Sequence, residues 1–214
     1  MNPTAAIIVA YFLGAIPSSA VAARLAGVDL RARGSGNLGF TNVLRVLGPR
    51  YAVPVLIVDA GKGVAAVLLA RHADTAGWAL GAETTALLGG VAAIAGHVWS
   101  IFVRFRGGKG VATAAGVFGA LAPGAAAVSI AAWLVVVSAT RYVSLASVVA
   151  AVLLPIAVAA SHALRGAPQP APLLAASVVV AALVLVTHRS NIRRLVRGTE
   201  NRFGTSREKK EEEV

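Results

Sequence analysis

Residues 142–163 read YVSLASVVAAVLLPIAVAASHA and contain no Asp, Glu, Lys or Arg. A helix of about 20 apolar residues covers the roughly 30 Å hydrocarbon core of a bilayer. Other apolar runs lie on both sides of this segment, at 4–24, 52–70, 79–103, 111–122, 124–140 and 171–187. Together they predict an all-α, polytopic integral membrane protein with about seven transmembrane helices, of which 111–122 is short.

The composition agrees with this fold class. Apolar residues make up 57% of the 214 residues and charged residues 14%, and the mean hydropathy is +0.75. A soluble domain of this length could not bury so much apolar surface. The absence of cysteine excludes disulfides, thiolate metal sites and cysteine nucleophiles, and no carboxylate pair has metal-site spacing. We therefore expect neither a metal nor a cofactor.

The net charge of +11 shows how the chain is oriented. Basic residues gather in a first loop (Arg24, Arg31, Arg33, Arg45, Arg50), a third loop (Arg104, Arg106, Lys109) and a C-terminal segment (Arg189, Arg193, Arg194, Arg197, Arg202). The positive-inside rule puts all three in the cytoplasm and the N-terminus outside, and parity then requires seven spans. We expect one transmembrane domain at 1–204, a retained first span, and a charged, disordered tail at 205–214.

The first loop carries GSGNLGFTNVLR at 34–45. Its G-x-G-x-x-G opening does not indicate a dinucleotide fold, because Arg31-Ala32-Arg33 precedes it in place of a buried strand. Glycine-rich backbone can instead aim N–H groups at an anion, with neutral donors and an arginine beside them. An ordinary basic loop is the alternative. The candidate substrate-binding residues here are Ser35, Gly36, Asn37, Gly39, Thr41, Asn42 and Arg45.

The third loop carries GGKGVAT at 107–113. It lacks the Walker A spacing but combines glycines, one lysine and the start of a helix, which together suit a phosphate. A positive-inside anchor would explain the basic residues but not the glycines. The candidates are Gly107, Gly108, Lys109, Gly110 and Thr113.

The C-terminal segment carries HRSNIRRLVRGTEN at 188–201. A basic helix on anionic lipid explains Arg193, Arg194 and Arg197. It does not explain His188, Asn191, Glu200 and Asn201, which are therefore candidates for the site.

Two ionisable residues lie inside the second apolar run. Asp59 and Lys62 are three apart and share a helix face. Ionisable groups at membrane depth are costly and often functional, but an i,i+3 ion pair that satisfies itself is an equal alternative. His97 ends the third run and is more typical of a hydrogen-bonding residue than of a catalyst.

These separated motifs, with YFLGAIP at 11–17, DAGKG at 59–63 and GH at 96–97, resemble the bacterial acyl-phosphate:glycerol-3-phosphate acyltransferases, the PlsY family. The resemblance covers nearly the whole chain. Phe40, Ser100 and Arg106 depart from residues that are usual in the family, but the glycines and Arg45 are intact. The missing H-x-x-x-x-D arrangement fits a family that uses acyl phosphate and not acyl-CoA.

The resemblance implies transfer of a fatty acyl group from acyl phosphate to the 1-hydroxyl of sn-glycerol 3-phosphate, giving lysophosphatidate and phosphate. It implies a multi-pass protein of the bacterial inner membrane whose active site faces the cytoplasm. Expected partners are the two substrates, membrane lipid and the enzyme that makes acyl phosphate; no nucleic acid is expected. The expected catalytic residues are Lys109, His188, Asn191 and Glu200, with His188, Glu200 or the departing phosphate taking the proton.

Two other functions remain open at this point. A transporter for an organic phosphate could use the same loops, with Asp59 and Lys62 as an intramembrane gate. A lipid-binding scaffold could use the arginines only to hold anionic headgroups.

Overall fold

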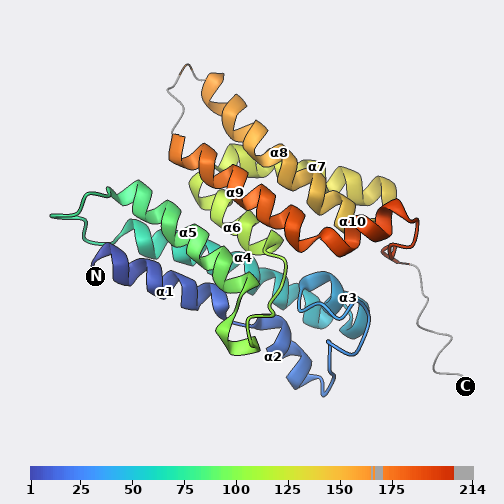
Figure 1. The fold of residues 1–214 in the computed structure, drawn as a ribbon. Coiled ribbons are helices and arrows are strands. Elements are labelled where there is room, and N and C mark those ends of the chain that lie inside the picture. Colours follow the sequence, from blue (N-terminus) through green and yellow to red (C-terminus); the bar gives the residue numbers. More distant parts are fainter. Residues whose placement is uncertain (165, 167–170, 205–214) are drawn as a thin grey trace, which may run out of the picture.

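The computed structural model describes residues 1–164, 166 and 171–204, and the secondary-structure elements among them are helices, with no strand. The elements are α1 (Pro3–Ala15), α2 (Ser18–Leu25), α3 (Phe40–Leu47), α4 (Pro49–Arg71), α5 (Ala82–Val98), the 3-10 turn η1 (Ile101–Val103), α6 (Val111–Leu121), α7 (Pro123–Thr140), α8 (Val143–Ala163), α9 (Ala171–Thr187) and α10 (Arg189–Val196). The predicted all-α membrane fold is confirmed (Figure 1). The predicted tail at 205–214 lies outside the described residues.

Five segments in the described part of the chain are long and apolar enough to cross a membrane: Pro3–Leu25, Pro49–Arg71, Ala82–Val103, Pro123–Thr140 and Val143–Ala163. A sixth is counted if α9 and α10, which meet at a 60° bend, form one span. The predicted short run at 111–122 is the 11-residue α6. All seven predicted runs are therefore helical, and the count of seven crossings stays a prediction.

Small residues let the helices of the N-terminal half approach closely. A side chain at Gly14 or Gly96 would collide with backbone across the α1–α5 contact. Gly63 and Gly116 allow the same close approach between α4 and α6, because a side chain at either position would collide with the backbone of the opposite helix. Helices in lipid usually associate through close backbone approach at small residues, because there is no hydrophobic driving force between them in that environment.

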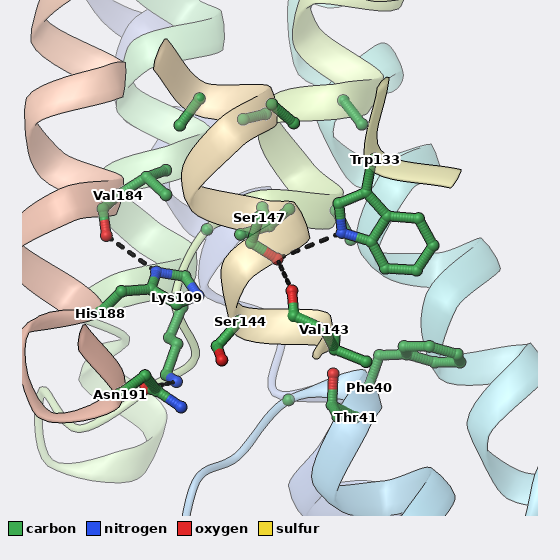
Figure 2. Close-up of a pocket in the computed structure, with 18 of the residues that line it drawn as sticks. Phe40, Thr41, Lys109, Trp133, Val143, Ser144, Ser147, Val184, His188 and Asn191 are labelled. Carbon is green, nitrogen blue, oxygen red and sulfur yellow. Dashed lines mark hydrogen bonds between the residues drawn. The ribbon is translucent and has the colours of Figure 1, made fainter. Parts of the chain in front are cut away.

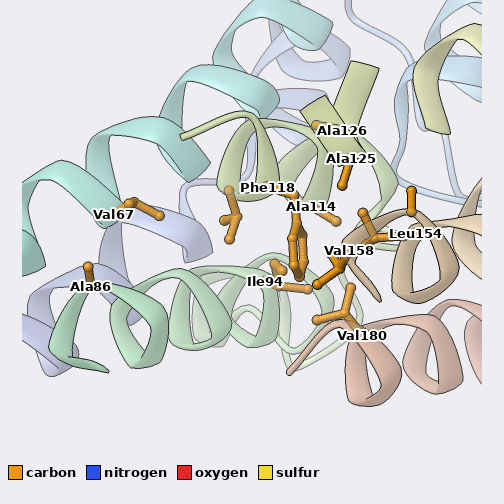
Figure 3. Packing of buried hydrophobic residues seen from close by; sticks show 12 residues of the cluster. Val67, Ala86, Ile94, Ala114, Phe118, Ala125, Ala126, Leu154, Val158 and Val180 are labelled. Atoms are coloured by element: carbon orange, nitrogen blue, oxygen red, sulfur yellow. The ribbon is translucent and has the colours of Figure 1, made fainter. Parts of the chain in front are cut away.

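The C-terminal half is built from α7, α8 and α9. Arg141, in the left-handed region at φ 60, turns the chain from α7 into α8. The buried side chains of Ile94, Phe118, Val158 and Val180 belong to one apolar cluster that joins α5 and α6 to this half (Figure 3).

The three basic segments meet. Arg31 of the first loop donates to the carbonyl oxygens of Val103 and Arg106 in the third loop, at 3.0 and 3.2 Å. Lys109 of the third loop donates to the Asn191 side chain in α10. These contacts bring the three segments to one end of the molecule, and their placement in the cytoplasm stays a prediction.

Candidate active site

A cavity of about 970 Å³ lies where the two halves of the molecule meet (Figure 2). One end is lined by polar side chains of the three basic segments. The other continues between apolar side chains of α6 to α9. The polar lining includes Ser35, Asn37, Thr41, Asn42, Arg45, Lys109, His188, Asn191, Arg194, Glu200 and Asn201, and the apolar lining includes Ala114, Ala115, Phe118, Ala126, Ile130, Trp133, Leu134, Ala151, Leu154, Val180 and Val184.

Asn42 holds the first loop in shape. Its side chain is 1% exposed, accepts the Ser35 N–H at 2.8 Å, and donates to the carbonyl oxygens of Leu30 and Arg33 at 3.1 and 3.2 Å. The Arg45 guanidinium, one helical turn further along α3, donates to the same amide oxygen at 3.4 Å. Asn42 therefore reaches the cavity wall while its polar atoms are bound to the protein itself.

Other residues of the first loop also contribute to the cavity wall. Ser35, Asn37, Gly39 and Thr41 line the cavity. Gly36 does not: it adopts φ +70 in a turn, and its N–H is bonded to the carbonyl of Arg33. Gly36 thus shapes the loop, and the polar surface comes from its neighbours.

The third loop does not present its first glycines to the cavity. The N–H of Gly107 is bonded to the carbonyl of Val98 at 3.0 Å, and that of Gly108 to the carbonyl of His97 at 3.1 Å. A Cβ at Gly108 would collide with the His97 ring and with the Leu38 carbonyl. The glycines are needed for close packing against the end of α5. Of the residues from Arg104 to Gly110, before α6 begins, only Lys109 and Gly110 line the cavity.

Thr113, also predicted at the site, lies elsewhere. It is 0% exposed within α6, its hydroxyl has no hydrogen-bond partner, and its carbonyl faces Gly63 of α4. The geometry makes it a residue of the α4–α6 contact.

Lys109 joins the two halves of the molecule at the polar end. Its ammonium donates to the Asn191 amide oxygen, and its carbonyl accepts the Thr187 hydroxyl at 3.2 Å. Burial lowers the pKa of Lys109 to about 8; the Glu200 carboxylate opposes this, and the Arg194 and Arg45 charges add to it. The side chain is therefore mainly cationic at neutral pH, but it loses its proton at a lower pH than an ordinary lysine does.

His188 lies just after α9 at the bend before α10 (Figure 2). Its Nδ1 lies 2.8 Å from the Val184 carbonyl, which can only accept, so Nδ1 carries the proton. Burial, and next the Lys109 charge, lower the pKa of His188 to about 4. The ring is thus neutral at physiological pH, with an unprotonated Nε2.

Glu200 is bound through both carboxylate oxygens. Asn191 Nδ2 donates to Oε1 at 2.7 Å and Arg194 Nε donates to Oε2 at 2.6 Å. Burial alone would raise the pKa of Glu200. The hydrogen bonds from Asn191 and Arg194 favour the carboxylate and outweigh burial, so the net pKa lies below its usual value. The carboxylate is ionised and fixes Asn191, which in turn receives Lys109.

Asp59 and Lys62 form a 2.8 Å ion pair in α4, and only Asp59 reaches the cavity. Among the described residues, no three His, Asp or Glu side chains gather in a way that could hold a metal ion.

Several cavity residues were not predicted from the sequence. Ser144, Ser147 and Trp133 come from α7 and α8, and polar residues at i and i+3 within an apolar run are the only signal that could have found the serines. Arg194, for which lipid anchoring was the expected role, is in an ion pair with Glu200.

The family model described as glycerol-3-phosphate acyltransferase matches residues 4–198. The chain belongs to this family. It is 45% identical over 197 residues to the glycerol-3-phosphate acyltransferase of Geotalea daltonii, covering 92% of this chain and 95% of the relative. It is 47% identical over 200 residues to glycerol-3-phosphate acyltransferase 2 of Moorella thermoacetica, covering 93% and 96%.

Two solved structures of PlsY, an integral membrane glycerol 3-phosphate acyltransferase, share the fold of this acyltransferase. The glycerol 3-phosphate form superposes with a TM-score of 0.83 at 40% identity, covering 95% of this chain and 96% of that one. The lysophosphatidic acid form gives 0.80 at 38% identity with the same coverage. The predicted PlsY resemblance is therefore confirmed, and the chain is an acyltransferase of phospholipid biosynthesis.

Proposed function

We propose that this membrane enzyme transfers a fatty acyl group from an acyl phosphate to the 1-hydroxyl of sn-glycerol 3-phosphate. The products are 1-acyl-glycerol 3-phosphate (lysophosphatidate) and inorganic phosphate. The observation that carries the proposal is the single cavity with a cationic polar end and an apolar end. Such a cavity suits two phosphorylated substrates of which one also carries an acyl chain.

Two of the basic side chains that line the cationic end, Arg45 and Lys109, are assigned to one phosphate each. Arg45 holds glycerol 3-phosphate, together with Ser35, Asn37, Thr41 and Asn201 of the same cavity wall. Lys109 and the Gly110 backbone at the start of α6 hold the phosphate of the donor, which becomes the leaving group. Within the described residues, neither Arg45 nor Lys109 forms an ion pair with a carboxylate, so both charges are available to an anion.

The chemistry is direct attack, without an acyl-enzyme. The substrate hydroxyl oxygen forms a bond to the acyl carbon, the bond from that carbon to the phosphate oxygen breaks, and phosphate leaves toward Lys109. The neutral His188 Nε2 accepts the hydroxyl proton and passes it to the departing phosphate. Glu200 is not the base, because both of its oxygens are engaged; it positions Asn191 and, through Asn191, Lys109.

The proposed function includes an orientation of the protein in the membrane. The three basic segments meet at one end of the molecule, and the positive-inside rule places that end in the cytoplasm and the N-terminus outside. The protein then lies in the bacterial inner membrane, takes its soluble substrate from the cytoplasm, and receives its donor from the enzyme that makes acyl phosphate. Membrane lipid surrounds the apolar end.

The test is a donor comparison on purified protein. Acyl phosphate with labelled glycerol 3-phosphate is expected to give labelled lysophosphatidate, and acyl-CoA is expected to give none. Turnover with acyl-CoA alone would overturn the proposed donor. Arg45→Ala is expected to raise the KM for glycerol 3-phosphate, with Arg24→Ala, an exposed arginine of α2, as the matched control.

A further inference from the structure

The first span is broken between α1 and α2, and side chains of α4 form hydrogen bonds with groups at the break. α1 ends at Ala15 and α2 begins at Ser18, with Pro17 between them. Lys62 donates its ammonium to the Ile16 carbonyl at 3.0 Å, and the Ser18 hydroxyl donates to Asp59 at 2.7 Å. A broken helix is tolerated in a membrane where neighbouring groups satisfy the freed backbone.

The Asp59 carboxylate is the centre of this arrangement. Its Oδ1 receives Ser18 and Lys62, and His97 Nδ1 lies 3.5 Å from the same oxygen. Asp59, Lys62 and His97 are 1%, 6% and 8% exposed. Because a buried ion pair contributes little net stability compared with apolar packing, stability alone does not explain the pair.

His97 connects this buried pair to the site. One side of its ring faces Asp59, and the edge with Nε2 lies against the backbone of Gly108. The His97 carbonyl also accepts the Gly108 N–H, and the next carbonyl, of Val98, accepts Gly107. The residue that follows these glycines is Lys109.

We propose that Asp59 is a positioning residue for the acyl transfer: with Lys62 it holds the His97 ring against Gly108 and so fixes the backbone from which Lys109 reaches the cavity. The inference rests on the proposed function, in which Lys109 receives the donor phosphate. The ion pair in α4 then supports the site of the leaving phosphate, in addition to its place in the membrane span. Ser18 and Lys62 link the same support to the break between α1 and α2.

A double-mutant cycle tests the connection. Asp59→Asn keeps the shape of the side chain and removes its charge. Misplacement of a reacting group by about 1 Å can cost roughly 100-fold, so we expect a kcat loss of up to that size. In a Lys109→Ala background the further loss from Asp59→Asn is expected to be less than about twofold, because residues that act as a unit are non-additive. Fully additive losses would overturn the inference. Full activity of Lys109→Ala alone would instead overturn the site in the proposed function.

A second measurement does not depend on turnover or on Asp59 itself. The chain has no cysteine, so Lys109→Cys gives a single thiol whose reaction rate with a maleimide reports on the loop. His97→Leu removes the ring nitrogen that lies 3.5 Å from the Asp59 carboxylate, whereas His97→Asn places an amide donor near the position of Nδ1. We expect His97→Leu to change the thiol rate severalfold and His97→Asn to leave it near that of the parent. Equal rates in both variants and in the parent would overturn the inference.

Discussion

Both glycine-rich loops have glycines close to a basic residue, but the glycines have different roles in the two loops. In the first loop an amide side chain, Asn42, takes up the Ser35 N–H, and several neighbouring residues face the cavity. In the third loop the carbonyls at the end of α5 take up the glycine N–H groups, and essentially one side chain, Lys109, faces the cavity. Glycines near a basic residue thus indicate close packing as readily as a backbone anion site.

The largest expected effect comes from the single side chain of the third loop. Removing a preorganised charge at a leaving group costs about 100- to 1,000-fold in kcat. Lys109→Ala is expected to lose activity in this range in a steady-state assay with acyl phosphate, with the KM for glycerol 3-phosphate changed much less. If the KM for glycerol 3-phosphate changed most, Lys109 would belong to the other phosphate.

The packing of the same loop gives the next effect. Gly108→Ala places a Cβ 2.8 Å from the Leu38 carbonyl oxygen and against the His97 ring. The loop must shift, and we expect a loss of kcat of about 10- to 100-fold, as for other small displacements at a site. Gly119→Ala in α6 is the matched control, since its Cβ meets no atom within 4 Å. Equal activity of the two variants would show that the contact with α5 does not position Lys109.

In the first loop, two asparagines separate support from contact. Asn42→Ala leaves buried groups unpaired and is expected to destabilise the fold by about 2 kcal/mol and to raise the KM for glycerol 3-phosphate. Asn37 lies on the cavity wall and has no hydrogen bond to the described residues that would hold the loop, so Asn37→Ala is expected to raise the KM without changing the melting temperature. Both quantities are read on the same detergent-solubilised preparations. If this loop only held anionic headgroups by its charge, Asn37→Ala and Arg45→Lys would both be harmless.

The smallest effect is a dependence on pH. The pKa of Lys109 is lowered to about 8, so raising the pH through this value removes the proton and with it the positive charge that we propose receives the leaving phosphate. At pH 8 about half of the Lys109 side chains keep their charge, so kcat is expected to be about twofold lower than at neutral pH. Lys109→Arg stays charged and is expected to move this decline to higher pH, after correction for spontaneous hydrolysis of the donor. An unmoved decline would assign it to another group.

Much of the site could be predicted because charged and amide side chains are rare in a chain of this composition. Arg45, Lys109, His188, Asn191 and Glu200 were predicted as site residues from local patterns, and the structure brings them to one cavity. The sequence could not show which N–H groups are already bonded within the protein. Gly107, Gly108, Gly36 and Thr113 therefore lie off the cavity wall, since their environment depends on α4, α5 and the loop's own turns.

The apolar lining from α7 and α8 was missed for the opposite reason. Trp133, Ile130 and Leu134 look like any other residues of an apolar run, and only the packing of the helices decides which of them face lipid and which face a cavity. The break at Ile16–Pro17 also lies inside a continuous apolar run, and its partners Lys62 and Asp59 come from α4, more than 40 residues further along the chain.

The cavity with one polar and one apolar end has a kinetic consequence. With acyl phosphate as the proposed donor, neither substrate has to leave its own phase: glycerol 3-phosphate arrives from water, and the donor arrives by diffusion within the plane of the bilayer. The enzyme therefore responds to the donor's mole fraction in the membrane surface. Adding inert phospholipid or detergent at constant total donor should slow the reaction by surface dilution, while the same dilution leaves the encounter with glycerol 3-phosphate unchanged.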